Sequence, residues 1–411
     1  MNSPSMAGLQ HLPRKSWIGA VLLALLICLP GCSGEIIKET EARPVEKPTT
    51  SPMWLGNTSR NFYGTGPWDD ESLEVVWEFE TRMTSGRLHK DPWGGSSWPG
   101  QPSVDDKYVY FGSADSYLYC LNREDGSLVW SFKTGDSLKA TPTISGDRVI
   151  ASGLDHYVYC LNANDGSLIW KFKTGFEIDC SAAVIDGRVY LGGEDGFFYC
   201  LNLADGSLVY KSERLGSMEG SFSVVDGRIY TGTEQGDLYC LALSDGQIIW
   251  KARLGADSDS TPAVSEGLVY TAAENGYVYS FHQDNGQPVW QFKAEGGFNY
   301  KDIKKGFWAS PVLANGRVYI GSSNGYMYCL SADTGKVVWQ HAVRGPIWSS
   351  SPLVDGRLVF GDKAGWVYML AADDGTRIGE LKIGDNINAT PAVLDGRVYI
   401  GAFNGNLYCL K

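Results

Sequence analysis

Several signatures of catalysis and electron transfer are missing from this sequence. It contains no CxxCH haem-attachment motif, no HExxH zinc motif, no G-x-S-x-G nucleophile motif and no EF-hand calcium loop. Histidine is scarce, and apart from His11 its positions are scattered along the chain: His89, His156, His282 and His341. These absences argue against a haem-bearing electron carrier, a zinc protease and a serine hydrolase. We therefore expect no enzyme, no catalytic residues, no metal ligands and no cofactor.

Positive charge is also in short supply. Lysine and arginine total 35 against 47 aspartate and glutamate residues, which gives a formal net charge of -12 at pH 7. An acidic protein repels the phosphates of nucleic acids and of anionic lipid surfaces. We therefore expect no nucleic-acid partner.

An apolar run of membrane-spanning length is absent as well. The run "WIGAVLLALLICL" at 17–29 follows Arg14 and Lys15 and is too short to cross a bilayer comfortably, so it is typical of an export signal. It ends in "LPGC", which resembles the bacterial lipoprotein signal, in which cleavage precedes a cysteine that becomes lipid-modified. The resemblance implies lipidation of Cys32. The alternative is an ordinary signal peptide with an incidental cysteine.

This interpretation divides the chain into three segments. Residues 1–31 are expected to be the lipoprotein signal peptide, and residues 32–53 the lipidated cysteine and a flexible tether rich in Pro, Glu, Lys and Thr. Residues 54–411 are expected to form the folded domain. We expect an exported protein, anchored to a membrane by its N-terminal lipid at the cell envelope. In a Gram-negative source this would be the periplasmic face of the outer membrane.

What the sequence has in abundance is a repeat. The stretch "YCLNREDGSLVW" at 119–130 returns as "YCLNANDGSLIW" at 159–170 and "YCLNLADGSLVY" at 199–210. The leading tyrosine recurs every 40 residues, with one step of 49, at the following positions: Tyr119, Tyr159, Tyr199, Tyr239, Tyr279, Tyr328, Tyr368 and Tyr408. Such a repeat implies one repetitive architecture rather than two or three separate domains.

Each unit has the pattern of four short strands. Runs of β-branched and aromatic residues are separated by Asp-Gly, Asn-Gly or Glu-Gly, which supply the positive φ that tight hairpins require. The frequent glycines exclude a helical array of similar period, and the Trp-Asp signature of WD40 repeats is absent. The predicted fold class is therefore all-β, an eight-bladed β-propeller of four-stranded antiparallel blades.

The strand inventory also predicts how the ring closes. The tyrosine-bearing third strand occurs eight times, but only seven fourth strands follow one. The missing copy lies in "LEVVWEFET" at 73–81, which contains Trp77. An N-terminal strand should therefore complete the last blade, which removes open sheet edges.

The stretch "LSADTGKVVW" at 330–339 and its relatives resemble the PQQ-type propeller repeat, in which a packing tryptophan follows a turn glycine by four residues. The resemblance covers residues 73–411 and implies that this tryptophan docks each blade against the next one. The blade-docking residues would be Trp77, Trp130, Trp170, Trp250, Trp290 and Trp339. Because Tyr210 and Gly379 depart from the pattern, we expect those two junctions to pack differently.

The cysteines and one acidic stretch favour structural roles. Equivalent positions of six blades carry cysteine, too far apart for disulfides, so we expect these thiols to be buried apolar residues: Cys120, Cys160, Cys200, Cys240, Cys329 and Cys409. The related PQQ-dependent dehydrogenases characteristically carry adjacent cysteines near their quinone and calcium, and no Cys-Cys pair exists here. The acidic stretch "ADSDS" at 256–260 lacks calcium-loop spacing and is interpreted as a solvated loop.

Two insertions supply the candidate partner-binding residues. Residues 82–100 and 294–308 each link a fourth strand to the next blade's first strand, so both should emerge on one face of the propeller. Their aromatic and cationic side chains are typical of a recognition surface, although they could instead fold inward and plug the central channel. Elsewhere, small polar residues at the starts of first strands would line the channel with hydroxyls. The candidates are His89, Trp93, Trp98, Phe298, Tyr300, Lys301, Phe307, Trp308 and, from an equivalent connection, Trp348.

Taken together, the anchor, the repeat and the length resemble the BamB-type family of outer-membrane protein assembly lipoproteins. The resemblance implies a non-catalytic envelope scaffold, with a monomeric propeller that docks protein partners of the barrel-assembly machinery. Two alternatives stay open. Bound PQQ with calcium would indicate a PQQ-dependent quinoprotein oxidoreductase. A ligand that protects the two insertions from proteolysis would indicate a surface ligand-binding or sensory propeller lipoprotein.

Overall fold

The part of the protein that the structure describes is built from strands alone. In the computed structural model the chain divides into two units, Met1–Glu46 and Lys47–Lys411. The described residues all belong to the second unit: 53, 55–60, 64–66, 68, 72–82, 101–296, 306–384 and 386–411. Within these ranges no helix is long and apolar enough to cross a membrane.

Eight four-stranded sheets, numbered as blades 1 to 8, make up this unit. Blade 1 contains β2 (Ser103–Val104), β3 (Tyr108–Gly112), β4 (Tyr117–Asn122) and β5 (Leu128–Lys133). Blade 2 contains β6 (Thr143–Ser145), β7 (Arg148–Ser152), β8 (Tyr157–Asn162) and β9 (Leu168–Lys173). Blade 3 contains β10 (Ala183–Ile185), β11 (Arg188–Gly192), β12 (Phe198–Asn202) and β13 (Leu208–Lys211). Blade 4 contains β14 (Phe222–Val225), β15 (Arg228–Gly232), β16 (Asp237–Ala242) and β17 (Ile248–Arg253).

The second half of the ring repeats the plan. Blade 5 contains β18 (Ala263–Ser265), β19 (Leu268–Ala272), β20 (Tyr277–His282) and β21 (Pro288–Lys293). Blade 6 contains β22 (Val312–Ala314), β23 (Arg317–Gly321), β24 (Tyr326–Ser331) and β25 (Val337–Ala342). Blade 7 contains β26 (Leu353–Val354), β27 (Arg357–Gly361), β28 (Trp366–Ala371) and β29 (Arg377–Lys382). Blade 8 contains β30 (Ala392–Leu394), β31 (Arg397–Gly401), β32 (Asn406–Leu410) and β1 (Val75–Glu80).

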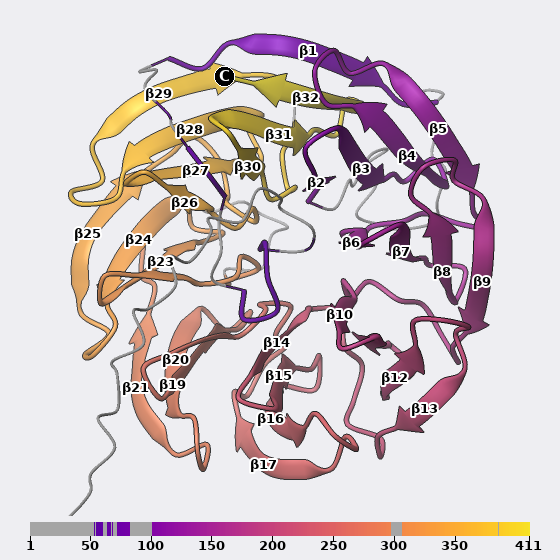
Figure 1. Cartoon of the computed structure of the whole chain (residues 1–411). Coiled ribbons are helices and arrows are strands. Elements are labelled where there is room, and N and C mark those ends of the chain that lie inside the picture. Colours follow the sequence, from indigo (N-terminus) through magenta and orange to yellow (C-terminus); the bar gives the residue numbers. More distant parts are fainter. Residues whose placement is uncertain are drawn as a thin grey trace, which may run out of the picture. The chain divides into compact units, whose positions relative to one another are not determined.

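The blades circle one axis, with the first strand of each nearest the centre and the fourth outermost (Figure 1). Seven blades take their four strands in chain order, whereas in blade 8 the outer strand is β1, which pairs antiparallel with β32 so that Trp77 lies opposite Cys409. The predicted eight-bladed propeller and its closure by an N-terminal strand are both confirmed. Closure leaves no blade with an unfilled fourth position, which couples β1 to the stability of the ring.

The turn between the first and second strands explains why Asp-Gly recurs. In blade 3 φ is 47° at Asp186 and 70° at Gly187, and in blade 8 it is 50° at Asp395 and 70° at Gly396. Two successive residues with positive φ are the mark of the two-residue turn whose twist matches that of the flanking strands. Aspartate tolerates the first position and glycine suits the second, so this dipeptide sets the hairpin register.

Each fourth strand that carries a tryptophan docks it onto the next blade. The indole N–H of Trp130 donates to the carbonyl of Ala163 at 2.9 Å, and its ring lies so close to Gly166 that a Cβ there would come within 2.6 Å of a ring atom. The same two contacts recur, one blade on each time, for the other sequence-predicted docking residues: Trp77, Trp170, Trp250, Trp290 and Trp339.

The two exceptions behave differently from each other. Tyr210 donates its hydroxyl to the Leu243 carbonyl at 2.8 Å and packs on Gly246, so the expectation of a different packing there is wrong, because only the donor atom changes. Gly379 has no ring to dock. Blade 8 takes its outer strand from β1, so it has no turn between a third and a fourth strand and no turn glycine to receive one. A tryptophan at this position would lack the partner that the other junctions provide.

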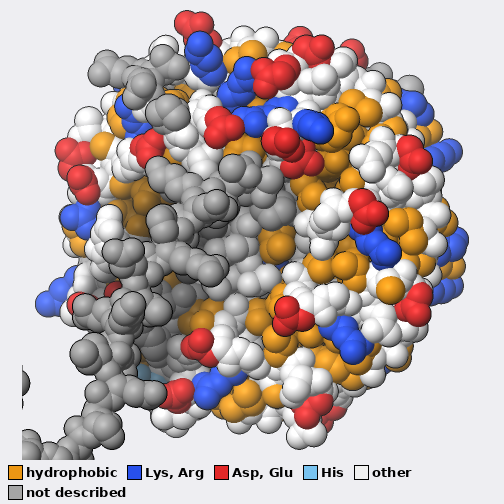
Figure 2. Space-filling view, viewed as in Figure 1, with side chains coloured by type: hydrophobic (Ala, Val, Ile, Leu, Met, Phe, Trp, Pro, Cys, Tyr) orange, Lys and Arg blue, Asp and Glu red, His pale blue; other side chains and the backbone are white. Residues whose placement is uncertain are grey.

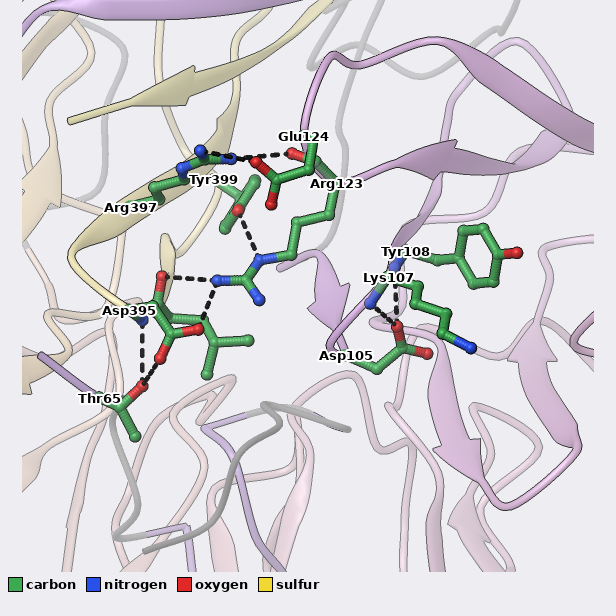
Figure 3. Close-up of polar contacts among 10 residues, drawn as sticks. Thr65, Asp105, Lys107, Tyr108, Arg123, Glu124, Asp395, Arg397 and Tyr399 are labelled. Atoms are coloured by element: carbon green, nitrogen blue, oxygen red, sulfur yellow. Dashed lines mark hydrogen bonds and ion pairs between the residues drawn. The ribbon is translucent and has the colours of Figure 1, made fainter.

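The junction between blades 8 and 1 carries an additional polar network (Figure 3). Arg123 is buried; its Nε donates to the Tyr399 hydroxyl at 3.0 Å and its Nη2 lies 2.6 Å from a carboxylate oxygen of Asp395. The backbone amide of Asp395 in turn donates to the Thr65 hydroxyl at 3.0 Å. The network therefore fastens the N-terminal segment and blade 1 to blade 8 where the ring closes.

The cysteines lie in the apolar layers between blades. All the cysteines in the described ranges are buried and free, including Cys120, which shares a core cluster with Tyr110 and Trp130. Burial raises the pKa of the Cys120 thiol to about 12. A thiol held in its neutral form is unreactive, so these cysteines act as small packing residues.

Candidate binding site on the inner rim of the loop face

One face of the ring gathers the turns and connections that vary in sequence. In an antiparallel blade, the turn between the second and third strands and the connection to the next blade leave from the same end. Backbone hydrogen bonds tie the two together. The amide of Glu194, in a blade 3 turn, donates to the Glu177 carbonyl at 3.1 Å, and the amide of Glu274 donates to the Asp257 carbonyl at 2.9 Å. We call this side the loop face.

A ring of hydroxyls lies at the start of the first strands. Each hydroxyl accepts a hydrogen bond from a backbone amide of the preceding blade. The Thr141 amide donates to the Ser181 hydroxyl at 3.0 Å, and the Ser181 amide donates to the Ser221 hydroxyl at 2.9 Å. Farther round, the Ser350 amide donates to the Thr390 hydroxyl at 3.0 Å. All of these residues are buried. The sequence predicted that these hydroxyls line the channel. In the structure they join neighbouring blades instead.

The residue two positions before each hydroxyl residue belongs to what we call the inner rim. The backbone setting repeats from blade to blade, but the side chain changes each time. The described rim residues are Lys139, Asp179, Glu219, Asp259, Trp308, Trp348 and Asn388. The repeat therefore presents one base, three acids, two indoles and an amide at equivalent places around the axis.

Blades 3 to 5 make one part of the rim acidic. Rim residues Asp179, Glu219 and Asp259 are joined by Glu194 and Glu234 from the turns of blades 3 and 4, and we call these five residues the acidic arc. One carboxylate oxygen from each of the three glutamates lies within 4.8 Å of the others. At the edge of the arc, the Lys139 ammonium lies 3.2 Å from Asp179.

Burial and repulsion by neighbouring carboxylates raise the pKa of three of these carboxyls, Glu194, Glu219 and Asp259. Desolvation, followed by the negative charge of Asp179, raises the pKa of Glu194 to about 8. Desolvation, followed by the charge of Asp259, raises the pKa of Glu219 to about 10. The pKa of Asp259 is raised well above its usual value, first by burial and then by neighbouring carboxylates. Carboxyl groups in this state have a strong tendency to take up a proton or a cation.

The stretch 256–260, interpreted from the sequence as a solvated loop, is only partly exposed. Ser258 and Ser260 are buried and the Oδ1 atom of Asp259 is shielded from solvent, whereas Ala256, Asp257 and the rest of Asp259 have intermediate exposure. The stretch lies beside the acidic arc because a regular blade-to-blade connection brings it there. Sequence reasoning missed the arc as a whole, since its members are spread from 179 to 259 and only the 40-residue repeat, aligned position by position, brings them together.

The next two rim positions form an aromatic pair. The rings of Trp308 and Trp348 stack with centroids 4.3 Å apart and an interplanar angle of 10°. The Trp348 indole donates to the Ser323 hydroxyl at 3.0 Å. The ammonium of Lys363, from the turn of blade 7, lies 3.3 Å from the centroid of the Trp348 ring, and burial lowers the pKa of this lysine to about 8. This side of the rim is therefore aromatic and capped by a cation.

The candidate partner-binding residues divide into three groups. Trp308 and Trp348 meet on the rim, whereas Phe307 is fully buried in the core cluster that contains Tyr328 and therefore packs inside the protein. The remaining candidates lie outside the described residues: His89, Trp93, Trp98, Phe298, Tyr300 and Lys301. Cys32 and the tether, up to residue 52, also lie outside them.

A short N-terminal segment, residues 55–60, reaches across the ring; we call it the strap. The Leu55 amide donates at 2.8 Å to Gln101, which precedes β2, and the Thr58 carbonyl accepts at 2.8 Å from Val224 in β14. These partners belong to blades 1 and 4, on different sides of the axis (Figure 1). Arg60 is completely buried. The strap therefore occupies space near the axis that sequence reasoning had left open.

The outer strands expose apolar residues in most blades. The first two residues of these strands, for example Leu128 and Val129 at 45% and 42% exposure, project outward. Figure 2 shows hydrophobic side chains as separate clusters between charged ones on the face seen in Figure 1. Because the feature recurs with the repeat, it belongs to the framework. The loop face, where equivalent positions differ, is the candidate site.

A model of the family described as "Outer membrane protein assembly factor BamB" matches nearly all of the described unit, over residues 69–213, 200–299, 275–378 and 301–411. The comparison with curated proteins found no match.

Among solved structures, BamB from Moraxella catarrhalis is 18% identical with a TM-score of 0.54, covering 75% of this chain and 83% of that one. A europium-containing methanol dehydrogenase is 15% identical with a TM-score of 0.71, covering 89% of this chain and 98% of that one. A quinohemoprotein alcohol dehydrogenase from Comamonas testosteroni is 13% identical with a TM-score of 0.72, covering 88% of this chain and 80% of that one. At such identities the likeness shows the fold alone.

Proposed function

The chain belongs to the BamB family of outer membrane protein assembly factors, and from this premise we propose that it is a non-catalytic docking scaffold for protein partners in the cell envelope. The observation that carries the proposal is the inner rim. On one repeated backbone it places a carboxylate arc beside a stacked pair of indoles with a lysine above them. Charged and aromatic groups side by side on one face suit the recognition of another protein.

The anchor belongs to the same proposal. Cys32, at the end of the apolar N-terminal run, carries lipid and holds the propeller at the periplasmic side of the outer membrane through the tether at 33–52. The variant Cys32→Ala should move the protein from the membrane fraction to the soluble fraction. Mass spectrometry of the N-terminal peptide would detect the lipid directly, and an unmodified Cys32 would contradict the anchor.

Affinity purification from the native membrane tests the docking role. The wild-type protein should recover subunits of the outer-membrane barrel-assembly machinery. Trp308→Ser, on the rim, should recover less of them, whereas Val129→Ser, on an outer strand away from the loop face, should match the wild type. Absence of these subunits from the wild-type sample would contradict the scaffold and favour the sensory alternative.

The two insertions extend the proposed docking surface. In the sequence, both insertions occupy the same kind of blade-to-blade connection as the rim residues. The paired variants Trp93→Ala with Trp98→Ala, and Phe298→Ala with Tyr300→Ala, should each reduce partner recovery without lowering the melting temperature. His89→Ala and Lys301→Ala test the polar contribution in the same way. Unchanged recovery in all of them would confine the docking surface to the rim.

A PQQ-dependent oxidoreductase is the second candidate, favoured by the carboxylates of the acidic arc. Their oxygen atoms suit a hard cation such as the calcium that accompanies PQQ in the related dehydrogenases. The aromatic pair does not suit the quinone, because two indoles stacked at 4.3 Å leave no slot for a planar ring between them. Incubation with PQQ and calcium, followed by gel filtration and an absorbance spectrum, tests whether the protein binds the quinone. Quinone that stays with the protein would support the oxidoreductase.

A further inference from the structure

Among the described residues, no lysine or arginine forms an ion pair with the three glutamates of the acidic arc, and the charge of Asp259 adds to theirs. Carboxylate oxygens of Glu219 and Glu234 lie within 4.8 Å of each other, and the proximity of Glu234 is one of the causes that raise the pKa of Glu219, after burial and the charges of Asp259 and Asp179. The nearest lysine at the edge of the arc, Lys139, already pairs with Asp179. The cluster is therefore electrostatically incomplete.

A buried, unpartnered oxygen points to the same conclusion independently. The Oδ1 atom of Asp259 is shielded from solvent and has no hydrogen-bond partner among the described residues. The carboxylates whose charge acts on it include Asp257, Glu274 and Glu234. A buried carboxylate oxygen surrounded by like charges and without a donor costs free energy, and this cost is relieved by a proton or by a positively charged ligand that donates hydrogen bonds.

We propose that this cluster binds the ammonium group of a lysine side chain on a partner protein, an inference that rests on the docking function proposed above. An ammonium group has three N–H donors in a tetrahedral arrangement. With donor–acceptor distances near 2.8 Å, its three acceptors stand roughly 4.6 Å apart. The oxygens of Glu194, Glu219 and Glu234 lie within 4.8 Å of one another, which matches that spacing.

The origin of the three glutamates favours lysine over arginine. Glu194 and Glu234 come from turns of two blades and Glu219 from the connection between those blades, so their carboxylates converge from different directions. A guanidinium presents its donors in one plane, whereas an ammonium donates in three directions. The neighbouring pair of Lys139 and Asp179, at 3.2 Å, shows the same chemistry within the chain.

The aromatic pair would orient the partner segment. Lys363 lies over the Trp348 ring and repels a second cation on that side of the rim, so the partner's lysine is directed to the acidic arc. Trp348 is buried, with Trp308 stacked on its ring and Lys363 over it, so the partly exposed Trp308 ring offers the surface for an apolar or aromatic neighbour of that lysine. The preferred partner segment therefore combines a lysine with an apolar residue.

Isothermal titration calorimetry with hexalysine as the probe tests the contact. Hexalysine should bind the wild type, and the same peptide with all side-chain amines acetylated should not. Glu219→Gln keeps the shape and removes a charge, so it should weaken binding about tenfold or more. Glu213→Gln, an exposed residue outside the arc, should bind as the wild type does. Because Glu219→Gln relieves repulsion, its melting temperature should not fall, which separates lost binding from lost folding.

Two results would overturn the inference. One is equal hexalysine affinity in the wild type and Glu219→Gln. The other is a cluster that binds calcium chloride but gives no heat with hexalysine, which would make it a metal site. Repeating the membrane purification with Glu219→Gln separates the two proposals. If only the wild type recovers assembly subunits, the result supports both the scaffold and the lysine contact. If the wild type and Glu219→Gln recover them equally, the result supports the scaffold but contradicts the lysine contact. Absence of assembly subunits from the wild type contradicts the scaffold itself.

Discussion

The blade junctions and the inner rim are built on the same repeated backbone. The side chains at the junctions stay nearly the same from blade to blade, whereas those on the rim change. At the junctions one solution recurs: an indole donates to a carbonyl of the next blade and packs on a turn glycine, as Trp130 does with Ala163 and Gly166. On the rim, equivalent positions change from Lys139 to Asp179 and then, farther round, to Trp308. The framework repeats its residues and the rim does not.

The difference has a physical origin. At a junction, the glycine, the carbonyl and the ring are fixed by two neighbouring sheets, so few side chains fit. The substitution of Tyr210 keeps both contacts, and Gly379 occurs where the neighbouring turn does not exist. A rim side chain instead meets another variable rim residue in the next blade, as Lys139 meets Asp179 and Trp308 meets Trp348. Its identity is free to follow whatever binds there, which is why variation within a repeat indicates function.

The most severe way to break the framework is to remove the strand that closes it. Deleting residues 73–81 takes away β1 and Trp77 and exposes the edge of β32. We expect loss of most of the stability, because a buried tryptophan alone accounts for about 3–5 kcal/mol and a whole domain for about 5–15 kcal/mol. Deleting 33–52 instead, which spares the buried Met53, should leave the melting temperature unchanged. Equal thermal melts of the two truncations would contradict the closure argument.

A single junction offers a finer test. Trp130→Ala should lower the free energy of unfolding by about 3–5 kcal/mol, because it leaves a cavity over Gly166 and removes the indole donor from the Ala163 carbonyl, which keeps only the long hydrogen bond of 3.4 Å from the Tyr110 hydroxyl. Trp130→Tyr copies the Tyr210 junction and should cost less than about 1.5 kcal/mol. Urea denaturation of both variants measures the difference. Similar losses in the two would show that the hydroxyl cannot replace the indole donor.

The same contrast explains why the fold could be predicted from the sequence and the rim could not. Blade number, strand count and closure by 73–81 follow from local patterns, since Asp-Gly turns and a period of 40 residues act within each unit. The acidic arc depends on which residues from different blades meet near one axis, and no single unit carries that information. The strap was out of reach for the same reason: the partners of Leu55 and Thr58 lie far along the chain at Gln101 and Val224.

On the rim, the acidic arc should make the protein less stable as pH rises. The pKa of Glu194 is about 8 in the folded protein and near 4.5 when unfolded, so between these values the folded state binds more protons. Its contribution is greatest below pH 4.5 and is lost by about pH 8. The charges that act on it are those of Asp179, Glu177 and Glu234 against Lys139.

Melting temperatures measured from pH 5 to pH 8 test this contribution. Glu219→Gln, which removes one of the repelling carboxyls, should flatten the decline, and the exposed Glu213→Gln should not. An unchanged slope in Glu219→Gln would mean that the arc is not electrostatically strained, which would weaken the case for a cationic partner.

The aromatic side of the rim should respond with the opposite sign and the smallest amplitude. Burial lowers the pKa of Lys363 to about 8 from 10.5, so between these values the unfolded state binds more protons and stability rises with pH. Lys363→Met keeps an apolar contact with Trp348 but removes the titrating group, and should abolish the rise between pH 8 and pH 10. The exposed Lys382→Met serves as the control. If both variants follow the wild-type profile, the ammonium over Trp348 is better hydrated than its packing implies, and it would no longer direct a partner's lysine toward the acidic arc.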